Sequence, residues 1–125
     1  MILCSIETQY CAPFSIVNAF LFKPPAPYVY TFPNEVVQLR TAHGTRICAT
    51  FIRRPGAALY LLLSHGNAED LNTAYGFMQR LSLSLDVNVV GYDYTGYGCS
   101  TGTCQSFLLH RNVAMTGSDI LCALV

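Results

Sequence analysis

The residues with the clearest chemical potential lie in one polar loop, His65-Gly66-Asn67-Ala68-Glu69-Asp70. Acyl transfer passes through a negatively charged oxygen, and backbone N–H groups at a strand-to-helix turn stabilise that charge without rearranging. Gly66 lets the backbone approach a substrate closely, and the amides of Asn67 and Ala68 are the candidate donors. The motif alone is equally typical of a polar turn with a helix cap, in which His65 forms only local hydrogen bonds.

A second, glycine-rich loop contains a serine in the pattern G-x-S-x-G, Gly98-Cys99-Ser100-Thr101-Gly102. In a nucleophile elbow, a strand runs directly into the first glycine and a helix starts just after the serine. Here Asp93 to Tyr97 separate that glycine from the preceding strand, and poor helix formers follow the serine. His110 also precedes Asp119, which reverses the order of acid and histidine that accompanies such an elbow. We therefore predict that Ser100 is not a catalytic nucleophile.

Other polar and aromatic residues have simpler explanations than catalysis. His43 falls in a turn, and Asp93 is expected to anchor its own loop through backbone N–H groups. Tyr94 and Tyr97 either line an acyl pocket or pack as ordinary aromatic residues. The cysteines include no paired C-x-x-C motif and no accompanying histidine cluster, so we predict no metal site.

Both loops follow segments with the pattern of buried strands. Ala57 to Ser64 is a nearly continuous apolar run, typical of a strand covered on both faces, and Val87 to Tyr92 is a second one. Between them, Leu71 to Leu85 has helical spacing of apolar residues and an acidic start that suits the helix dipole. The helical stripe comprises Leu71, Tyr75, Met78, Leu81 and Leu85. This strand-helix-strand unit should bring both loops to the carboxyl edge of one sheet, where ligands of α/β proteins bind.

The remaining segments frame that unit. Val36 to Thr41 and Arg46 to Arg53 are predicted strands joined by a turn at His43-Gly44. Residues 1–32 are read as an apolar, proline-rich lead-in, and residues 33–125 as a truncated domain. A closing helix over Ser106 to Val125 is weakened by Gly117, and the chain is expected to end before the domain is complete.

Composition excludes several functional classes. The 125 residues suit one small domain, and 52% hydrophobic residues exclude a disordered chain. A net charge of zero provides no surface for nucleic-acid phosphates, so we predict no nucleic-acid partner. The start of the chain lacks the basic region of a secretory signal, which argues against reading the six cysteines as disulfides. The apolar segment Cys11 to Phe22 is interrupted by Pro13 and is too short to span a membrane.

Two motifs at this spacing resemble one family. D-Y-x-G-Y-G-x-S at Asp93 to Ser100 and S-H-G-N-A-x-D-L at Ser64 to Leu71 are similar to the alpha/beta hydrolase domain-containing protein 17 family. The resemblance covers roughly Phe20 to Thr103. It implies an α/β fold, namely an incomplete α/β-hydrolase fold with an N-terminal hairpin and one βαβ unit of a mostly parallel sheet. It also implies that Ser100 is structural and that the nucleophile elbow belongs to the next strand, which this sequence lacks.

The same resemblance implies a function. The family consists of serine hydrolases that remove palmitoyl groups from protein cysteine thioesters, without a cofactor. It implies an acylated protein substrate, a pocket that includes His65, Tyr94 and Tyr97, and peripheral association with the cytoplasmic face of membranes through acylated Cys4 and Cys11. Because an elbow is lacking, we expect the chain alone to be inactive. Two alternatives stay open: a non-catalytic binding or regulatory fragment that uses the unpaired edge of Ala57 to Ser64, or an incomplete gene model.

Overall fold

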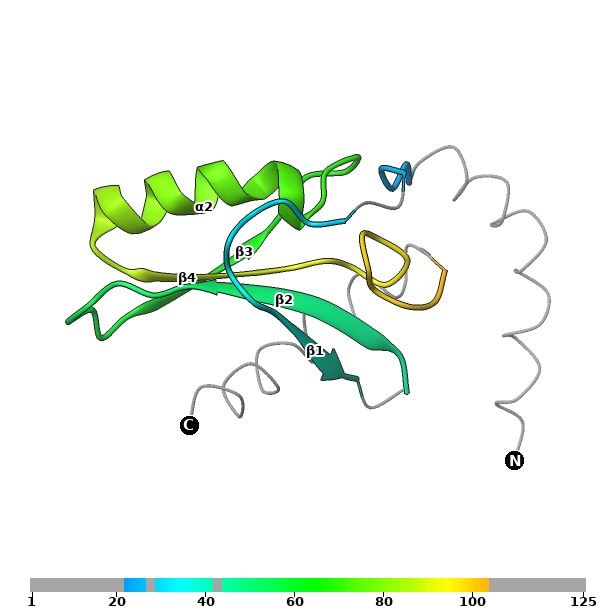
Figure 1. The fold of residues 1–125 in the computed structure, drawn as a ribbon, viewed down its shortest axis with the longest axis horizontal. Helices are drawn as coiled ribbons and strands as arrows, with labels where there is room; N and C mark the ends of the chain where they lie inside the picture. The colour runs from blue at the N-terminus through cyan, green and yellow to red at the C-terminus, as the bar shows by residue number, and fades with distance from the viewer. Residues whose placement is uncertain (1–21, 27–28, 42–43, 104–125) are drawn as a thin grey trace, which may run out of the picture.

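The computed structural model describes residues 22–26, 29–41 and 44–103. Within them, one helix packs on a four-stranded sheet (Figure 1). The elements in chain order are β1 (Val36–Arg40), β2 (Arg46–Ile52), β3 (Tyr60–Ser64), α2 (Leu71–Leu85) and β4 (Asn88–Tyr92). The predictions for Cys4, Cys11, His43, His110, Asp119 and the closing helix concern residues outside the described ranges.

The sheet has the strand order β1-β2-β4-β3, which confirms the predicted hairpin and βαβ unit. β1 pairs antiparallel with β2, and β2 pairs antiparallel with β4. β3 and β4 are parallel, with Leu61 opposite Val89 and Ser64 opposite Tyr92. Of the three ladders between described strands, only this one is parallel, because the hairpin occupies the other half of the sheet. The parallel pair brings the ends of β3 and β4 to the same edge.

β3 differs from its prediction in length and in burial. It begins at Tyr60 rather than at Ala57, and the segment before it is held instead by Asn88, whose side chain donates to the carbonyl of Ala57 over 2.9 Å. Leu61 and Leu63 pack into the core, while the side chain of Leu62 is 38% exposed. The expectation of a strand covered on both faces is therefore wrong for the described residues, because α2 covers only one face of this edge strand.

Helix α2 begins and ends at the predicted residues. Asp70 is its N-cap: its carboxylate accepts from the Thr73 N–H over 2.8 Å, and the Thr73 hydroxyl accepts from the Asp70 N–H over 2.9 Å. Leu71, Tyr75 and Met78 of the predicted stripe are buried. Leu85 lies in the helix at its predicted spacing, but it is 54% exposed in the last turn and does not extend the buried stripe.

The polar residue Ser82 is buried in α2 instead. Its hydroxyl donates to the Val87 carbonyl over 2.8 Å, and its own carbonyl accepts from the Asp86 N–H at the helix end. Asp86 has a φ of 53°, the left-handed conformation that commonly ends a helix. The end of α2 is thus fixed by hydrogen bonds that lead the chain into β4, and not by a further apolar side chain.

The core lies between α2 and the central strands. Its fully buried members include Cys48 of β2, Met78 of α2 and Val89 of β4. Every residue of β4 is buried, and Gly91 leaves room for the side chain of Met78. The segment before β1 closes this core over the start of α2, since Phe32 stacks on Tyr75 with ring centroids 4.6 Å apart. This packing holds α2 rigidly over the ends of β3 and β4.

Candidate functional site

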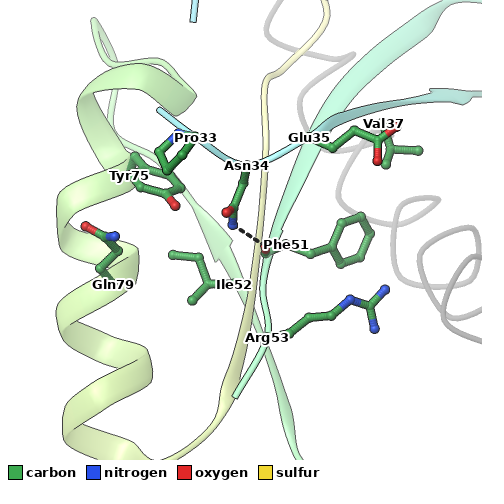
Figure 2. A pocket seen from close by; sticks show the side chains of 9 residues that line it. All are labelled: Pro33, Asn34, Glu35, Val37, Phe51, Ile52, Arg53, Tyr75 and Gln79. Carbon is green, nitrogen blue, oxygen red and sulfur yellow. Dashed lines mark hydrogen bonds between the residues drawn. The ribbon is translucent and has the colours of Figure 1, made fainter. Parts of the chain in front are cut away.

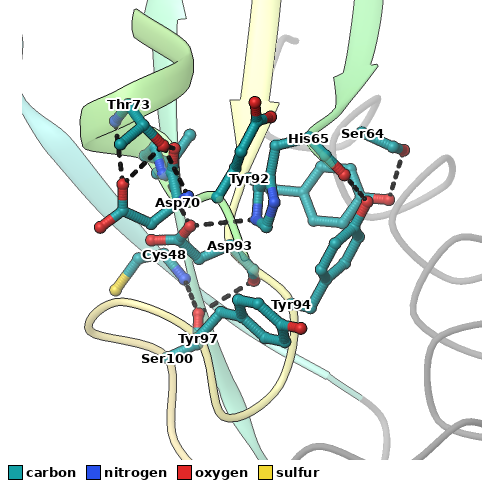
Figure 3. A network of polar contacts seen from close by, with 12 residues as sticks. Cys48, Ser64, His65, Asp70, Thr73, Tyr92, Asp93, Tyr94, Tyr97 and Ser100 are labelled. Carbon is teal, nitrogen blue, oxygen red and sulfur yellow. Dashed lines mark hydrogen bonds and ion pairs between the residues drawn. The ribbon is translucent and has the colours of Figure 1, made fainter. Parts of the chain in front are cut away.

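Two loops meet at the carboxyl ends of β3 and β4, as predicted. We call His65–Asp70 the β3 loop and Asp93–Gly102 the β4 loop. The Tyr94 hydroxyl donates to the His65 carbonyl over 2.6 Å, and the Tyr97 hydroxyl donates to the Asn67 side-chain oxygen over 2.7 Å. Figure 3 shows these aromatic side chains of the β4 loop beside His65. The two loops therefore form one continuous rim.

A tight turn shapes the β3 loop. The Glu69 N–H donates to the Gly66 carbonyl over 3.1 Å, which makes Asn67 and Ala68 the central residues of the turn. Ala68 has a φ of 66°, in the left-handed region that non-glycine residues seldom adopt. The Glu69 carboxylate accepts from the Gly66 N–H over 2.8 Å, so Gly66 is not an available donor. The amides of Asn67 and Ala68 lie outside the turn's own hydrogen bond, and both residues are exposed.

Asp93 joins the β4 loop to three other parts of the molecule. One carboxylate oxygen accepts from the Leu71 N–H over 2.8 Å and lies 3.2 Å from the His65 ring nitrogen Nε2. The other oxygen accepts from the Tyr30 hydroxyl. The side chains of His65 and Asp93 are 1% and 0% exposed, so this carboxylate has its partners within the protein and not in solvent (Figure 3). Asp93 was predicted to anchor its own loop through backbone N–H groups; it does accept from a backbone N–H, but this group belongs to Leu71 at the start of α2.

His65 is held by local contacts of its own loop. Its ring nitrogen Nδ1 lies 2.9 Å from the Gly66 carbonyl oxygen, and Nε2 lies within ion-pair distance of Asp93 without the alignment of a hydrogen bond. The ring also packs against Tyr94, with centroids 4.3 Å apart. These contacts agree with the local hydrogen bonding considered above for this motif. Whether His65 also contacts a substrate stays a prediction.

The two tyrosines of the β4 loop are arranged edge to face, with ring centroids 5.5 Å apart. Tyr97 is buried, whereas Tyr94 is partly exposed. Burial raises the pKa of the Tyr94 phenol to about 12, and the nearby Tyr92 adds to that rise. Tyr94 is therefore neutral near pH 7 and acts as a hydrogen-bond donor. Its part in an acyl pocket, like that of Tyr97, stays a prediction.

Ser100 connects the β4 loop to β2. Its hydroxyl donates to the Asp93 carbonyl over 2.9 Å and accepts from the Cys48 N–H over 2.9 Å. No described helix follows Ser100, since the chain continues through Thr101 as a loop whose N–H donates to the Arg46 carbonyl over 2.8 Å. This serine therefore uses both its donor and one acceptor position to hold the loop against β2.

Sequence reasoning missed the contacts that Tyr30 and Glu69 make with the two loops. Tyr30 lies 63 residues before Asp93, so only the folded chain brings them together, and burial raises the pKa of its phenol with a further contribution from the hydrogen bond to Asp93. The Glu69 contact with the Gly66 N–H was open to prediction, because an acidic residue three positions after a glycine can close back on the turn.

A hollow of about 580 Å³ lies away from both loops, between α2, β2 and the segment before β1 (Figure 2). Ile52 and Tyr75 face it, and the Asn34 side chain donates to the Phe51 carbonyl over 2.6 Å at its rim. It contains none of the predicted site residues. Among the described residues there is also no group of three side chains suited to a metal ion and no helix long and apolar enough to cross a membrane.

Comparison with known proteins shows that this chain is similar to alpha/beta hydrolase domain-containing proteins. The alpha/beta hydrolase domain-containing protein aho-3 of Caenorhabditis elegans is 38% identical over 82% of this chain and 39% of its own length. Alpha/beta hydrolase domain-containing protein 17B is 44% identical in Xenopus tropicalis, over 63% of this chain and 28% of the relative. The human 17B protein is also 44% identical, over 54% of this chain and 24% of the relative. The chain thus spans about two fifths or less of these relatives. No protein-family model matches it.

Solved structures show the same fold at low sequence identity. The esterase Pf2001 of Pyrococcus furiosus superposes with a TM-score of 0.60 at 14% identity, over 82% of this chain and 40% of the esterase. DcsB, in complex with a substrate analogue, gives a TM-score of 0.57 at 20% identity, over 73% of this chain and 31% of that one. The chain is thus a homologue of aho-3 and of the alpha/beta hydrolase domain-containing 17 proteins over part of their length, and its fold matches part of an α/β-hydrolase domain.

Proposed function

We propose that this chain supplies the oxyanion-binding side of a hydrolase site that cleaves palmitoyl thioesters of proteins. The observation that carries the proposal is the turn of the β3 loop, whose two central residues, Asn67 and Ala68, are exposed at the end of a parallel strand. Their amides are the donors that the tetrahedral intermediate of acyl transfer requires. The family resemblance supports a fatty acyl thioester as the substrate.

The neighbouring contacts support this role because they fix the turn before a substrate arrives. The Asn67 side-chain oxygen is held by the Tyr97 hydroxyl, and the Glu69 carboxylate holds the Gly66 N–H. Asp93 links the following helix to the β4 loop, so the turn rests on a rigid support. Donors that need no rearrangement stabilise the developing charge most effectively.

In this proposal the nucleophile comes from outside the described residues. The only G-x-S-x-G pattern in the sequence is Gly98 to Gly102, and the hydroxyl of its serine is engaged between β2 and Asp93. The catalytic serine and its histidine are therefore expected from a part of the hydrolase domain that this sequence does not contain.

A fluorophosphonate probe tests that assignment directly. We expect the purified chain to remain unlabelled at every serine, because the Ser100 hydroxyl donates its proton to the Asp93 carbonyl and not to a base that would activate it. Labelling is read by mass spectrometry, with full-length human 17B protein as the positive control. Labelling of the wild-type chain that disappears in Ser100→Ala would contradict the assignment.

A matched pair of variants at Asn67 tests the oxyanion role. The experiment uses a chimera in which the matched part of this chain replaces the corresponding part of the worm protein aho-3. We expect Asn67→Pro to lower kcat for a fluorogenic acyl thioester by about 10²–10³-fold, because proline lacks the amide N–H. Proline is favoured at the first central position of such a turn, so the backbone should be preserved.

Asn67→Ala is the control, because it removes the contact with Tyr97 but keeps the amide. We expect it to lower kcat by less than about tenfold, the effect of losing the supporting hydrogen bonds that the Asn67 side-chain oxygen accepts from the Tyr97 hydroxyl and the Lys23 N–H. An active chimera in which both variants hydrolyse the thioester equally well would exclude the Asn67 amide as an oxyanion donor.

A second part of the proposal concerns where the protein is located in the cell. We propose that the protein associates peripherally with the cytoplasmic face of membranes, where its acylated protein substrates lie. Acylation of both Cys4 and Cys11 would give stable anchoring, whereas one acyl chain would give marginal binding. Both cysteines lie outside the described residues.

A second candidate function rests on the edge of the sheet. Within the described residues β3 pairs only with β4, and Leu59, Tyr60 and Leu62 near or within it are 71%, 44% and 38% exposed. An apolar strand edge of this kind favours pairing with another chain, as in a non-catalytic binding or regulatory protein. Co-purification of a stoichiometric partner, with solubility only in its presence, would favour this function over hydrolysis.

A further inference from the structure

Two cysteines far apart in the sequence lie side by side. Cys48 is a buried residue of β2, and Cys99 is an exposed residue of the β4 loop. The loop runs along β2 at this point: the Cys48 N–H donates to the Ser100 hydroxyl over 2.9 Å, and the Thr101 N–H donates to the Arg46 carbonyl over 2.8 Å. Cys99 is the residue next to Ser100, so its backbone is adjacent to that of Cys48.

Tyr30 lies beside both cysteines. The Cys99 N–H donates to the Tyr30 hydroxyl oxygen over 3.0 Å, and Tyr30 packs against the core cluster that contains Cys48. Burial raises the pKa of the Cys48 thiol to about 11, and the charge of Cys99 is the next largest cause.

We propose that Cys48 and Cys99 form a reversible disulfide when the protein meets a peroxide, which makes the β4 loop a redox-sensitive part of the site. The pairing requires Cα atoms about 4.4–6.8 Å apart. The hydrogen bonds that the Ser100 hydroxyl and the Thr101 N–H make with β2 hold the backbone of Cys99 next to that of Cys48.

The chemistry balances with hydrogen peroxide as the oxidant. The exposed Cys99 thiolate attacks one peroxide oxygen, which gives a sulfenic acid at Cys99 and, after protonation of the leaving hydroxide, one water. The Cys48 thiol, whose high pKa keeps it protonated until it reacts, then attacks the Cys99 sulfur and forms the S–S bond, while its proton and the departing hydroxide make the second water. Two thiols have lost two electrons, and the peroxide has been reduced to two waters.

The bond would fasten the β4 loop covalently to β2. It would form beside the Tyr30 hydroxyl, which accepts from the Cys99 N–H and holds Asp93. The loop that carries Tyr94 and Tyr97 is thus connected to a thiol pair that an oxidant reaches from the surface. This inference does not depend on hydrolysis by the chain.

Peptide mapping of the full chain tests the proposal. The reduced protein is treated with hydrogen peroxide, quenched with N-ethylmaleimide in denaturant, and digested with trypsin without a reductant. Cleavage after the arginines releases Cys48 on peptide 47–53 and Cys99 on peptide 81–111, which also contains Cys104. We expect these peptides to become linked in most chains and to separate on reduction with dithiothreitol.

Two single variants assign the bond. The linked peptides should persist in Cys104→Ser and be absent in Cys99→Ser. Linkage that persists in Cys99→Ser and is lost in Cys104→Ser would overturn the pairing. So would oxidation of wild-type Cys99 to the sulfinic or sulfonic acid while Cys48 is recovered as its maleimide adduct. This last test reads the states of Cys48 and Cys99 in the wild-type sequence, so it remains valid even if a variant fails to fold.

Discussion

Replacing Asp93 by asparagine is expected to destabilise the chain by about 2–4 kcal/mol. The side chain is fully buried and its two oxygens face the Leu71 N–H, the Tyr30 hydroxyl and the His65 ring. Asparagine keeps one oxygen but places an amide NH₂ against groups that need an acceptor. Urea unfolding followed by circular dichroism measures the loss, which is a large fraction of the stability of a small domain.

Asp86→Asn is the matched control, because it makes the same chemical change at an exposed carboxylate. Asp86 pairs with Arg54 over 2.7 Å, but its side chain is 74% exposed, and asparagine also tolerates its left-handed backbone. We expect this variant to change the free energy of unfolding by less than about 1 kcal/mol. Equal effects of the two substitutions would show that Asp93 does not hold the loops together.

The sequence predicts where the two loops lie but not the contacts of Asp93 between them. The alternation of strand and helix patterns was enough to bring the β3 and β4 loops to one edge, because parallel strands end on the same side of a sheet. The partners of Asp93 were not predictable, because Leu71 and Tyr30 lie 22 and 63 residues away. Local patterns identify which segments meet, but not which side chain bridges them.

The errors at the edge of the fold have a related cause. An apolar run indicates that a strand is suited to burial, but its neighbours decide whether it is buried. Within the described residues β3 has one neighbouring strand and one covering helix, so Leu62 remains partly exposed. Leu85 fits the helical period of α2, yet the hydrogen bonds of Ser82 and Asp86 end the helix there and direct the chain into β4.

For the candidate site, too, the sequence predicts the family and the positions of the donors but not the geometry of the turn. The motifs of the two loops were sufficient to identify the family, because they combine a specific pattern with a fixed spacing. The turn that presents Asn67 and Ala68 was predicted as a position only, since its geometry depends on Glu69 closing onto Gly66. The sequence therefore predicts which residues are the candidate donors, Asn67 and Ala68, but only the folded structure shows the turn in which they lie.

Replacing Gly91 by alanine is expected to destabilise the fold by about 1–3 kcal/mol, because the packing of α2 on β4 has no room for a methyl group. A Cβ atom at this position would lie 2.6 Å from the Met78 sulfur and 2.9 Å from a methyl carbon of Leu71. Gly76→Ala is the matched control: a Cβ there meets only the Arg80 side chain at 3.7 Å. In that helical position alanine should stabilise the protein by about 0.5–1 kcal/mol. The same substitution is thus expected to change stability in opposite directions at two positions.

A double-mutant cycle locates the strain at one contact. Met78→Ala alone should cost about 2–5 kcal/mol, because Met78 is fully buried and its removal leaves a cavity. In the Gly91→Ala/Met78→Ala protein the new methyl group occupies part of that cavity, so the double variant should be more stable than the sum of the single effects by about 0.5–3 kcal/mol. Additive effects in urea unfolding would contradict the contact between Met78 and Gly91. Since this contact sets how closely α2 approaches β4, it also sets the position of the helix start that Asp93 holds beneath the two loops.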